Sequence, residues 1–365
     1  MCYARHMFWR RSKKGKVYVG LSGGVDSSVS AALLKRAGYE VTGVFIRIAL
    51  PGYPCTAGED RREALRAATH LGISFVDIDL SEVYKQAVFE PSLKEFAQGR
   101  TPNPDALCNR EIKFGLFYRF AREHGADFVA TGHYAQIQNN AGEQQLFAGK
   151  DSSKDQSYFL WAVPEQELDH ILFPVGHLQK SEVRALAQKF GLPNAARKDS
   201  QGLCFLGDIG IEDMLTKELP HQRGVVFDEE GHSIGEHHGA VLYTLGQRHG
   251  FTIVAQGNNG LPHYVVAKSI KDNTVTVSTS KTPRGNRTRL IISNENWLGT
   301  VKTGHYFARF RYRAELIPAV LEKEDQGSVI VLKGAHLAPE GQSLVLYQGE
   351  RCIGGGIIAE ATIEN

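Results

Sequence analysis

The chain has 365 residues, which is enough for two or three domains if each takes roughly 150 residues. Its formal net charge is +2 and 42% of its residues are hydrophobic, as in an ordinary globular protein. No stretch is long and apolar enough to cross a bilayer, so the composition argues against a membrane role. A nucleic-acid partner would have to bind a local basic patch, because a nearly balanced net charge gives the chain no strong overall electrostatic field.

The five cysteines, Cys2, Cys55, Cys108, Cys204 and Cys352, are odd in number and widely scattered. No C-x-x-C pair and no secretory leader occur, which argues against a disulfide framework and a structural zinc site. We therefore expect a cytoplasmic protein without a protein-built metal site. Residues 1–15 form a basic tail, for which a solvated end, an RNA-touching arm and a targeting remnant all stay open.

The first half of the chain alternates strands with helices. Strands are predicted at residues 16–21, 41–48, 74–80 and 128–130. Helices are predicted from the turn after residue 21 to Ala37, with Gly38 as a C-cap, and at 59–71, 82–98, 112–124 and 181–190. This order predicts a parallel sheet with helices on both faces, which binds ligands at the carboxyl ends of its strands.

After about Gly207 the helical period fades. Short strands are predicted at 241–245, 264–268 and 274–278, and a basic link with Pro and Gly at 281–289. Further strands at 306–312, 328–332, 343–347 and 352–358 fit a small β-barrel. Within 306–313 the strand period places Arg309, Arg311 and Arg313 on one face, either as a solvated face or as a track for RNA phosphates.

Residues 22–28, SGGVDSS, stand between the first strand and the first helix. Glycines at such a turn let backbone N–H groups point at an anion, and the helix N-terminus adds partial positive charge. Neither G-K-[ST] nor G-x-G-x-x-G is present, so a P-loop NTPase and a dinucleotide fingerprint are excluded, while an ordinary Gly-rich turn stays open. The motif resembles the pyrophosphate loop of the ATP pyrophosphatases, which adenylate a substrate oxygen and release pyrophosphate.

Two segments present cysteines in polar surroundings. In residues 101–109, TPNPDALCN, we expect a Pro-rich loop that delivers Cys108 to the start of the next helix, where thiol pKa values are lowered. In residues 199–205, DSQGLCF, a second loop presents Cys204. Replacing a carbonyl oxygen by sulfur needs an activated oxygen and a nearby sulfur nucleophile, and two loop cysteines beside an ATP site meet that demand.

Five motifs in order, GRTPNPDALCNREIKFG, ATGHYA, KDQSYFLW, KDSQGLCFLG and YTLGQRHG, resemble the tRNA-specific 2-thiouridylases. RFRYRA and GQSLVLY in the later β region resemble that family more loosely. The resemblance implies an α/β parallel-sheet ATP pyrophosphatase domain at 16–206, a small central domain at 207–288 and a tRNA-contacting β-barrel at 289–365. It also implies Mg²⁺-ATP-dependent 2-thiolation of the wobble uridine in tRNAs for Lys, Glu and Gln.

The resemblance also implies site residues. Cys204 would carry the incoming sulfur as a persulfide and Cys108 would release it, ending as a Cys108–Cys204 disulfide, while Asp105 would act near the base. Some related enzymes have Cys in place of Asp105 and can use it to ligate an iron–sulfur cluster. Because this chain has Asp at that position, we expect no cluster here. Ile46 stands where many relatives have Met and should keep an apolar adenine contact. The implied ATP site comprises Gly20, Leu21, Ser22, Gly23, Gly24, Val25, Asp26, Ser27, Ile46 and Gly132. The implied tRNA contacts are Asn103, Pro104, Asp105, His133, Lys154, Asp155, Gln156, Arg311, Tyr312 and Gln342.

The expected partners are the anticodon stem-loop of tRNA and a sulfur donor, either a cysteine desulfurase or a relay protein. Three alternatives stay open: a small-molecule adenylating ligase, which would not need both cysteines, a non-catalytic RNA-binding adaptor, and thiolation of a different tRNA base. From its local sequence alone, His133 can also be an ordinary hydrogen-bonded loop histidine. Cys55 has no assigned role, and the sequence does not determine the sulfur donor, the full set of tRNAs or the oligomeric state.

Overall fold

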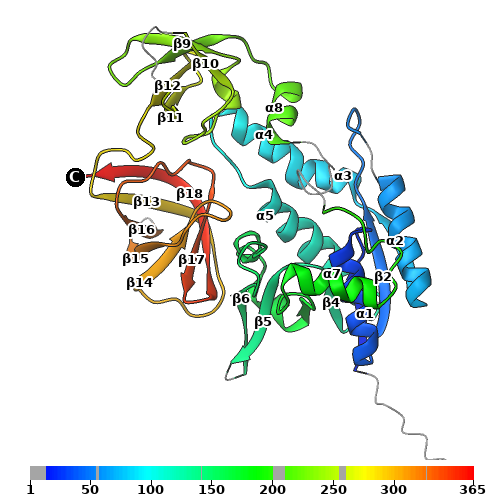
Figure 1. Cartoon of the computed structure of the whole chain (residues 1–365). Coiled ribbons are helices and arrows are strands. Elements are labelled where there is room, and N and C mark those ends of the chain that lie inside the picture. Colours follow the sequence, from blue (N-terminus) through cyan, green and yellow to red (C-terminus); the bar gives the residue numbers. More distant parts are fainter. Residues whose placement is uncertain (1–13, 55–56, 141, 200–209, 255–259, 326) are drawn as a thin grey trace, which may run out of the picture.

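The computed structural model of the protein describes residues 14–54, 57–140, 142–199, 210–254, 260–325 and 327–365. Cys55, Cys204 and most of the basic tail therefore lie outside the described residues. The described chain forms three sheets, which occupy separate regions in Figure 1. No helix in these ranges has the length and apolar character needed to cross a membrane.

The first sheet is parallel, as predicted. Its strands are β1 (Lys16–Gly20), β2 (Glu40–Arg47), β3 (Ser74–Asp79), β4 (Phe128–Ala130) and β7 (Ile171–Leu172), in the order β3-β2-β1-β4-β7. On one face Val17 and Val19 pack in a core cluster with residues of α1 (Val25–Ala37) and α2 (Ala57–Leu71). On the other face Val44 and Val129 pack against the helices that follow β3. Helices therefore cover both faces, and the carboxyl ends of the strands stay open to loops.

The remaining helical segments of this first domain are α3 (Ser81–Tyr84), η1 (Lys85–Phe89), α4 (Glu90–Ala97), α5 (Pro104–Cys108), η2 (Asn109–Leu116), α6 (Phe117–Glu123), η3 (Ser157–Phe159), η4 (Glu165–His170) and α7 (Lys180–Lys189). The predicted C-cap of α1 is confirmed: Gly38 has φ +98° and its N–H bonds the carbonyls of Leu34 and Lys35. A left-handed residue at this position satisfies carbonyls that the helix leaves open, and glycine adopts it without a Cβ clash.

The prediction of a loop that leads to Cys108 is wrong. Helical structure begins at Pro104, eight residues earlier than predicted, and continues through η2 and α6 to Glu123. Asn103 is the N-cap, and its side chain accepts a hydrogen bond from the Ala106 N–H at 3.2 Å. Asn at the N-cap followed by Pro at the first helical position is a helix start signal, which the two prolines of this segment obscured. Cys108 consequently lies in the second turn of a helix rather than at its first residue.

The second sheet contains β8 (Gly224–Phe227), β9 (Ser233–His237), β10 (Phe251–Ile253), β11 (Tyr264–Ser269) and β12 (Thr274–Ser278), in the order β10-β9-β8-β12-β11. The strands predicted at 264–268 and 274–278 are confirmed. The strand predicted at 241–245 is wrong: η5 (Ala240–Leu242) is a 3₁₀ turn, whose Ala240 N–H donates to the Asn273 side chain at 2.9 Å. Helix α8 (Ile211–Glu218) was not predicted, because only Met214 and Leu215 are buried on it.

The third sheet confirms the predicted barrel. Its strands are β13 (Arg287–Trp297), β14 (Gly304–Arg309), β15 (Ile317–Glu324), β16 (Gly327–Lys333), β17 (Ser343–Gln348) and β18 (Arg351–Glu364), and antiparallel pairing of β13 with β18 closes it. Leu290, Leu321, Leu332 and Leu344 are fully buried in its interior.

A hairpin from the first half of the chain extends this barrel. Strands β5 (Ala135–Asn140) and β6 (Glu143–Ala148) pair with each other, and β6 reaches β18 through the Phe147–Arg351 pair. Figure 1 shows the hairpin leaving the first domain toward the barrel. The barrel is thereby attached to the segment that follows β4, next to the loop at the end of the parallel sheet.

Candidate active site

The nucleotide loop, residues 21–24, connects β1 to the start of α1 at the carboxyl edge of the parallel sheet. Its carbonyl groups are tied back to the protein. The Gly24 carbonyl accepts hydrogen bonds from the hydroxyls of Ser27 at 3.1 Å and Ser28 at 3.0 Å. The Gly23 carbonyl accepts from Asn194 Nδ2 at 2.8 Å and from Arg197 Nη1 at 3.1 Å. Three N–H groups of the loop also donate within the protein: that of Leu21 to the Val44 carbonyl, and those of Ser22 and Gly24 to serine hydroxyls. An anion would therefore meet the N–H groups at the start of α1, which a helix leaves without intrahelical partners.

Two glycines of the predicted ATP site lie where no side chain fits. Gly23 has φ +79°, and a Cβ on it would lie 2.4 Å from the Asp60 carbonyl oxygen. A Cβ on Gly132, just after β4, would lie 2.7 Å from the Ser27 N atom and 2.9 Å from the Asp26 carbonyl carbon. The structure therefore brings Gly132 against the first turn of α1, and its contact with ATP remains a prediction. Ile46, near the end of β2, is 7% exposed within the core, so its adenine contact remains a prediction.

A cluster of charged side chains, formed by Asp26, Lys180, Asp199, Lys154 and Arg184, adjoins the loop. Asp26 in the first turn of α1 bonds Lys180 Nζ at 2.7 Å and the Tyr134 hydroxyl at 2.9 Å. Asp199 bonds Lys180 at 2.8 Å and Lys154 at 2.9 Å, and it also pairs with Arg184. Burial alone would raise the pKa of Asp199, but its bonds to Lys154 and Lys180 hold that pKa well below the usual range. The Asp199 carboxylate is thus ionised at neutral pH.

Four residues in or beside this site were missed from the sequence: Asn194 and Arg197, which contact the loop, Lys180, which contacts Asp26, and Asp199, which contacts Lys180. They come from α7 and from the segment that leads toward residue 204, more than 150 residues after the loop in the chain. No motif spacing connects them to SGGVDSS, so only the fold places them there.

Cys108 is fully buried, with 0% exposure, in a core cluster that also contains Val44 and Ile112. Asp105, one turn earlier on α5, is half-buried. Cys204 lies outside the described residues, so the approach of the two cysteines remains a prediction. Burial of Cys108 means that its sulfur becomes reachable only if neighbouring segments move.

A cavity of about 350 Å³ lies between α5 and the barrel. From this helix and its continuation it is lined by Arg110 and by Ala106 and Leu107, which precede Arg110 by four and three residues and so share its helical face. Asp105 and Cys108 are not among the lining residues, and the helical period places them on the opposite face. The rest of the lining includes barrel residues such as Ser293 and Ile357, so this cavity is a gap between domains, and we assign no ligand to it.

His133 lies in the loop after β4 and is 7% exposed. Its Nδ1 is 2.7 Å from Thr131 Oγ1, and Lys113 Nζ lies 3.3 Å from its Nε2. Because an ammonium group can only donate, Nε2 is the acceptor and the ring proton is assigned to Nδ1. Burial, together with repulsion from Lys113, holds the pKa of His133 well below its usual value of 6.5. The ring is therefore neutral at physiological pH.

This lowered pKa predicts a loss of stability in acid. The unfolded chain takes up a proton at His133 more readily than the folded chain, so stability falls as pH drops below about 6.5, by up to about 1.4 kcal/mol per pH unit. Melting temperatures measured between about pH 7.5 and about pH 5 should therefore decline less steeply for His133→Gln than for the unmodified protein. Parallel slopes for the two proteins would show that His133 is not a buried neutral group.

The predicted tRNA-contacting residues 154–156 make internal contacts, each with a different segment of the protein. Lys154 pairs with Asp199 beside the nucleotide loop. Asp155 is 5% exposed, accepts N–H bonds from Gly149 and Ser157 at 3.0 Å, and pairs with Arg309 of the barrel at 3.3 Å. Gln156 accepts a bond from the Tyr134 N–H at 3.0 Å. Contact of these residues with RNA remains a prediction, and in this structure they form a junction between site and barrel.

Other predicted tRNA contacts also make internal bonds. Asn103 Nδ2 donates to Ser343 Oγ at 3.2 Å, and Gln342 Oε1 accepts from the Tyr158 hydroxyl at 3.1 Å. The ring centroids of Tyr312 and Phe159 are 4.6 Å apart. Pro104 is buried at the start of α5. These residues come from the first domain and the barrel, and the fold gathers them at the contact between the two.

The predicted face of three arginines is wrong. Strand β14 ends at Arg309, which pairs with the buried Asp155, and Arg313 has φ +61°, so the strand period does not continue. Arg311 is half-buried, and its Nη2 donates to the carbonyls of Leu245 at 2.6 Å and Leu337 at 3.2 Å. Arg311 thus joins the central domain to the barrel.

We expect Arg311→Ala to weaken tRNA binding and leave ATP binding intact. The substitution also leaves two carbonyls without their donor, which should lower stability by about 1–3 kcal/mol. Filter binding of tRNA across a salt series measures the first effect and thermal melting measures the second. Arg313→Ala, which removes an exposed cation two residues away, should keep the original melting temperature. Unchanged tRNA affinity and salt slope in Arg311→Ala would remove this residue from the interface.

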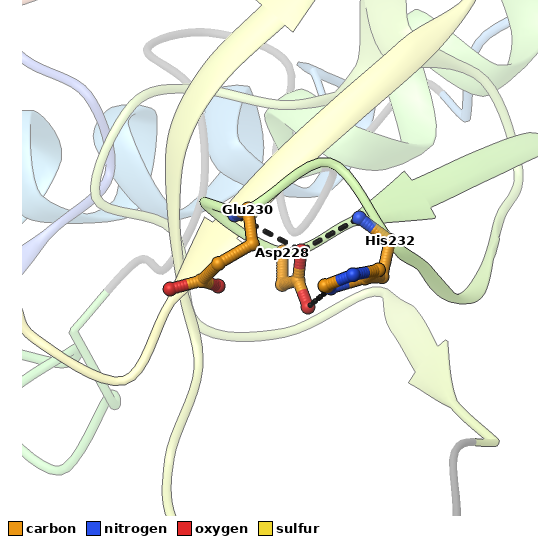
Figure 2. A group of neighbouring side chains, drawn as sticks. All are labelled: Asp228, Glu230 and His232. Carbon is orange, nitrogen blue, oxygen red and sulfur yellow. Dashed lines mark hydrogen bonds and ion pairs between the residues drawn. The ribbon is translucent and has the colours of Figure 1, made fainter.

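Figure 2 shows a group of metal-binding residue types in the central domain, Asp228, Glu230 and His232, on the turn between β8 and β9. Asp228 Oδ1 accepts the N–H groups of Glu230 at 3.1 Å and His232 at 2.7 Å, and its Oδ2 lies 3.0 Å from His232 Nδ1. Both oxygens of Asp228 therefore serve the turn itself. Glu230 and His232 are exposed, and we assign no metal to this group.

Comparison with known proteins gives the family. Residues 15–208 match the family described as tRNA methyl transferase HUP domain, residues 212–279 its PRC-barrel domain, and residues 287–358 an aminomethyltransferase beta-barrel domain. The tRNA-specific 2-thiouridylase MnmA of Halalkalibacterium halodurans is 40% identical over 358 residues, which cover 96% of each chain. The chain belongs to the tRNA-specific 2-thiouridylase family.

Other members of the 2-thiouridylase family are equally close. The MnmA protein of Aeromonas salmonicida is 42% identical over 364 residues, covering 94% of this chain and 96% of its own. Among solved structures, an NMN synthetase from Francisella tularensis covers 56% of the chain with a TM-score of 0.36 and 20% identity, which is too distant to carry an argument.

Proposed function

We propose that this protein is a tRNA-uridine 2-sulfurtransferase, which uses ATP to replace the C2 oxygen of the wobble uridine by sulfur. The observation that carries the proposal is the identity of about 40% to 2-thiouridylases over almost the whole length of both chains. The nucleotide loop, with its carbonyls tied back and its close glycines, fits the ATP-dependent step. The proposed substrates are the tRNAs for Lys, Glu and Gln, recognised through the anticodon stem-loop.

The proposed reaction has two stages. The C2 oxygen of uridine attacks the α-phosphorus of ATP, and pyrophosphate leaves. Cys108 then attacks the inner sulfur of a Cys204 persulfide, the outer sulfur leaves as sulfide, and this sulfide displaces AMP at C2. The two cysteines end as a disulfide, which an external thiol must reduce before the next turnover. A cysteine desulfurase, directly or through a relay protein, would reload Cys204.

Groups at the start of α1, next to the nucleotide loop, fit the phosphates of a nucleotide, and one carboxylate fits the metal ion that the nucleotide carries. The N–H groups at the start of α1 suit phosphate oxygens. Mg²⁺ usually binds one or two carboxylates together with substrate phosphates. Asp26, at the start of α1, is the carboxylate next to the loop. Both of its oxygens bond Lys180 in this structure, so it would hold the ion once Lys180 turns away from it, and the ion would supply charge neutralisation to the leaving pyrophosphate. With Asp105 in place of a cysteine, we expect no iron–sulfur cluster.

The decisive experiment is a reaction of the purified protein with wobble-uridine tRNA, Mg²⁺-ATP, and a desulfurase with cysteine. Thiolated tRNA is detected by its retardation in a mercury-containing gel, and AMP is measured in parallel. Retarded tRNA and tRNA-dependent AMP support the proposal. AMP without retarded tRNA would point to another base or sulfur donor, and neither product would favour an RNA-binding adaptor.

A further inference from the structure

Two cations lie beside the motif SGGVDSS although the motif contains none: Arg197, which bonds the Gly23 carbonyl, and Lys180, which bonds Asp26. Lys180 is the first residue of α7, and its Nζ is 2.7 and 2.8 Å from the two carboxylate oxygens of Asp26. The same Nζ is 2.8 Å from Asp199 Oδ1, and the Lys180 side chain is only 15% exposed. The ammonium group is therefore held at the first turn of α1, where an anion would bind.

The backbone and the core fix the position of Lys180. Its N–H donates to Asp151 Oδ2 at 2.9 Å, and the N–H of the preceding residue, Gln179, donates to Glu182 at 2.7 Å, which sets the start of the helix. Val183 of α7 is fully buried in a cluster with Val29 of α1. The two helices pack together, so Lys180 cannot drift from the loop without disrupting this core.

Electrostatics explains why a cation is needed there. Asp26 puts a negative charge beside a loop that would receive a polyphosphate, and this charge would repel the phosphates unless a cation, either an ammonium group or a metal ion, lies next to it. Lys180 neutralises that carboxylate. Lys154 and Arg184 also reach Asp199, so three cations face three carboxylates, Asp26, Asp199 and Asp151, and the charges of the cluster are balanced. Lys180 is the least exposed of these three cations, with 15% side-chain exposure against 31% for Lys154 and 29% for Arg184, so solvent screens its attraction to a phosphate group least.

We propose that Lys180 binds a phosphate of ATP, replacing part of its contact with Asp26 or Asp199 by a phosphate oxygen. It would thereby serve as the lysine that P-loop enzymes carry inside their loop motif and that this loop lacks. The inference rests on the proposed function and deepens it, because it assigns a substrate contact to a residue outside the motif.

Three ligands separate phosphate contact from a structural role. Equilibrium binding of Mg²⁺-ATP, Mg²⁺-pyrophosphate and adenosine is measured without tRNA on the full chain. Lys180→Met should weaken ATP and pyrophosphate binding at least about tenfold and leave adenosine binding unchanged, since one charge-assisted bond is lost. Lys180→Arg should stay within about threefold of the original ATP affinity, because it keeps the charge. Lys150→Met is the matched control: Lys150 pairs with Glu182 of the same helix and is half exposed, and its loss should change nothing.

Two outcomes would overturn the proposal. One is unchanged ATP affinity in Lys180→Met, and the other is an equal loss for ATP and adenosine, which would indicate a distorted site. Failure of the proposed function looks different: the unmodified protein would bind ATP with the same dependence on Lys180 and yet leave tRNA unthiolated.

Discussion

Replacing Cys108 by serine is expected to lower tRNA thiolation by at least about a thousandfold, as loss of a nucleophile does in other enzymes. A hydroxyl cannot attack a persulfide at neutral pH as a thiol does, so the sulfur stays on Cys204. The side chains are similar in size, and ATP binding should persist because Cys108 takes no part in the nucleotide loop. Mercury-gel retardation measures thiolation, and equilibrium binding measures ATP affinity.

Cys352 provides a matched control. It is also 0% exposed, in β18 of the barrel, and burial raises the pKa of its thiol to about 12. Each substitution by serine buries a hydroxyl and should cost stability by about 1–3 kcal/mol. Only the change at Cys108 should stop thiolation. Thiolation that survives in Cys108→Ser would mean that another group releases the sulfur.

The burial of Cys108 adds a condition to this expectation. Its sulfur belongs to a core cluster in the second turn of the α5–η2 helix, and a Cys204 persulfide must approach it before sulfur can transfer. Residues 154–156 connect the site, the barrel and the approach to Cys204, so RNA bound there would act on all three. We therefore expect tRNA binding to rearrange these segments and make the sulfur reachable.

The sequence predicts those parts of the fold whose pattern is local. Runs such as Lys16–Gly20 and Ser343–Gln348 alternate or are densely apolar, so four strands of the parallel sheet and four of the barrel could be predicted from such runs. Strands β7, β13 and β15 were missed, and β13 begins inside the segment predicted as a basic link. Hairpin β5–β6 was missed because its strands are largely polar and are stabilised by pairing with each other and with β18. Arg311 was misplaced because a strand period was continued beyond Arg309, where the chain turns.

The residues of the site also fall into those that a local motif identifies and those that only the fold brings together. SGGVDSS identifies the loop because glycine and helix-start chemistry lie within seven neighbouring residues. Lys180, Asn194 and Arg197 could not be identified, because their roles arise from the packing of α7 and the following segment on α1. Contacts between distant segments depend on three-dimensional distance, which one sequence does not display.

Gly132→Ala is expected to lower ATP-dependent activity by about a hundredfold, as a displacement of about 1 Å in a site can do. The added Cβ would lie 2.7 Å from the Ser27 N atom and 2.9 Å from the Asp26 carbonyl carbon. Both are backbone atoms of the first turn of α1, so relief requires a shift of the loop itself. Tight packing of this kind should also cost about 1–3 kcal/mol of stability. ATP affinity, AMP formation and thermal melting measure the three effects.

Gly58→Ala separates this steric effect from the general effect of a methyl group. Gly58 lies in the first turn of α2, and a Cβ there meets no atom within 4 Å. Alanine at that position should leave ATP binding unchanged and improve helix stability, by at most about 1 kcal/mol. If Gly132→Ala bound and used ATP as well as Gly58→Ala, the close approach of Gly132 to α1 would have no part in forming the nucleotide site. The loop motif would then have to act without support from β4.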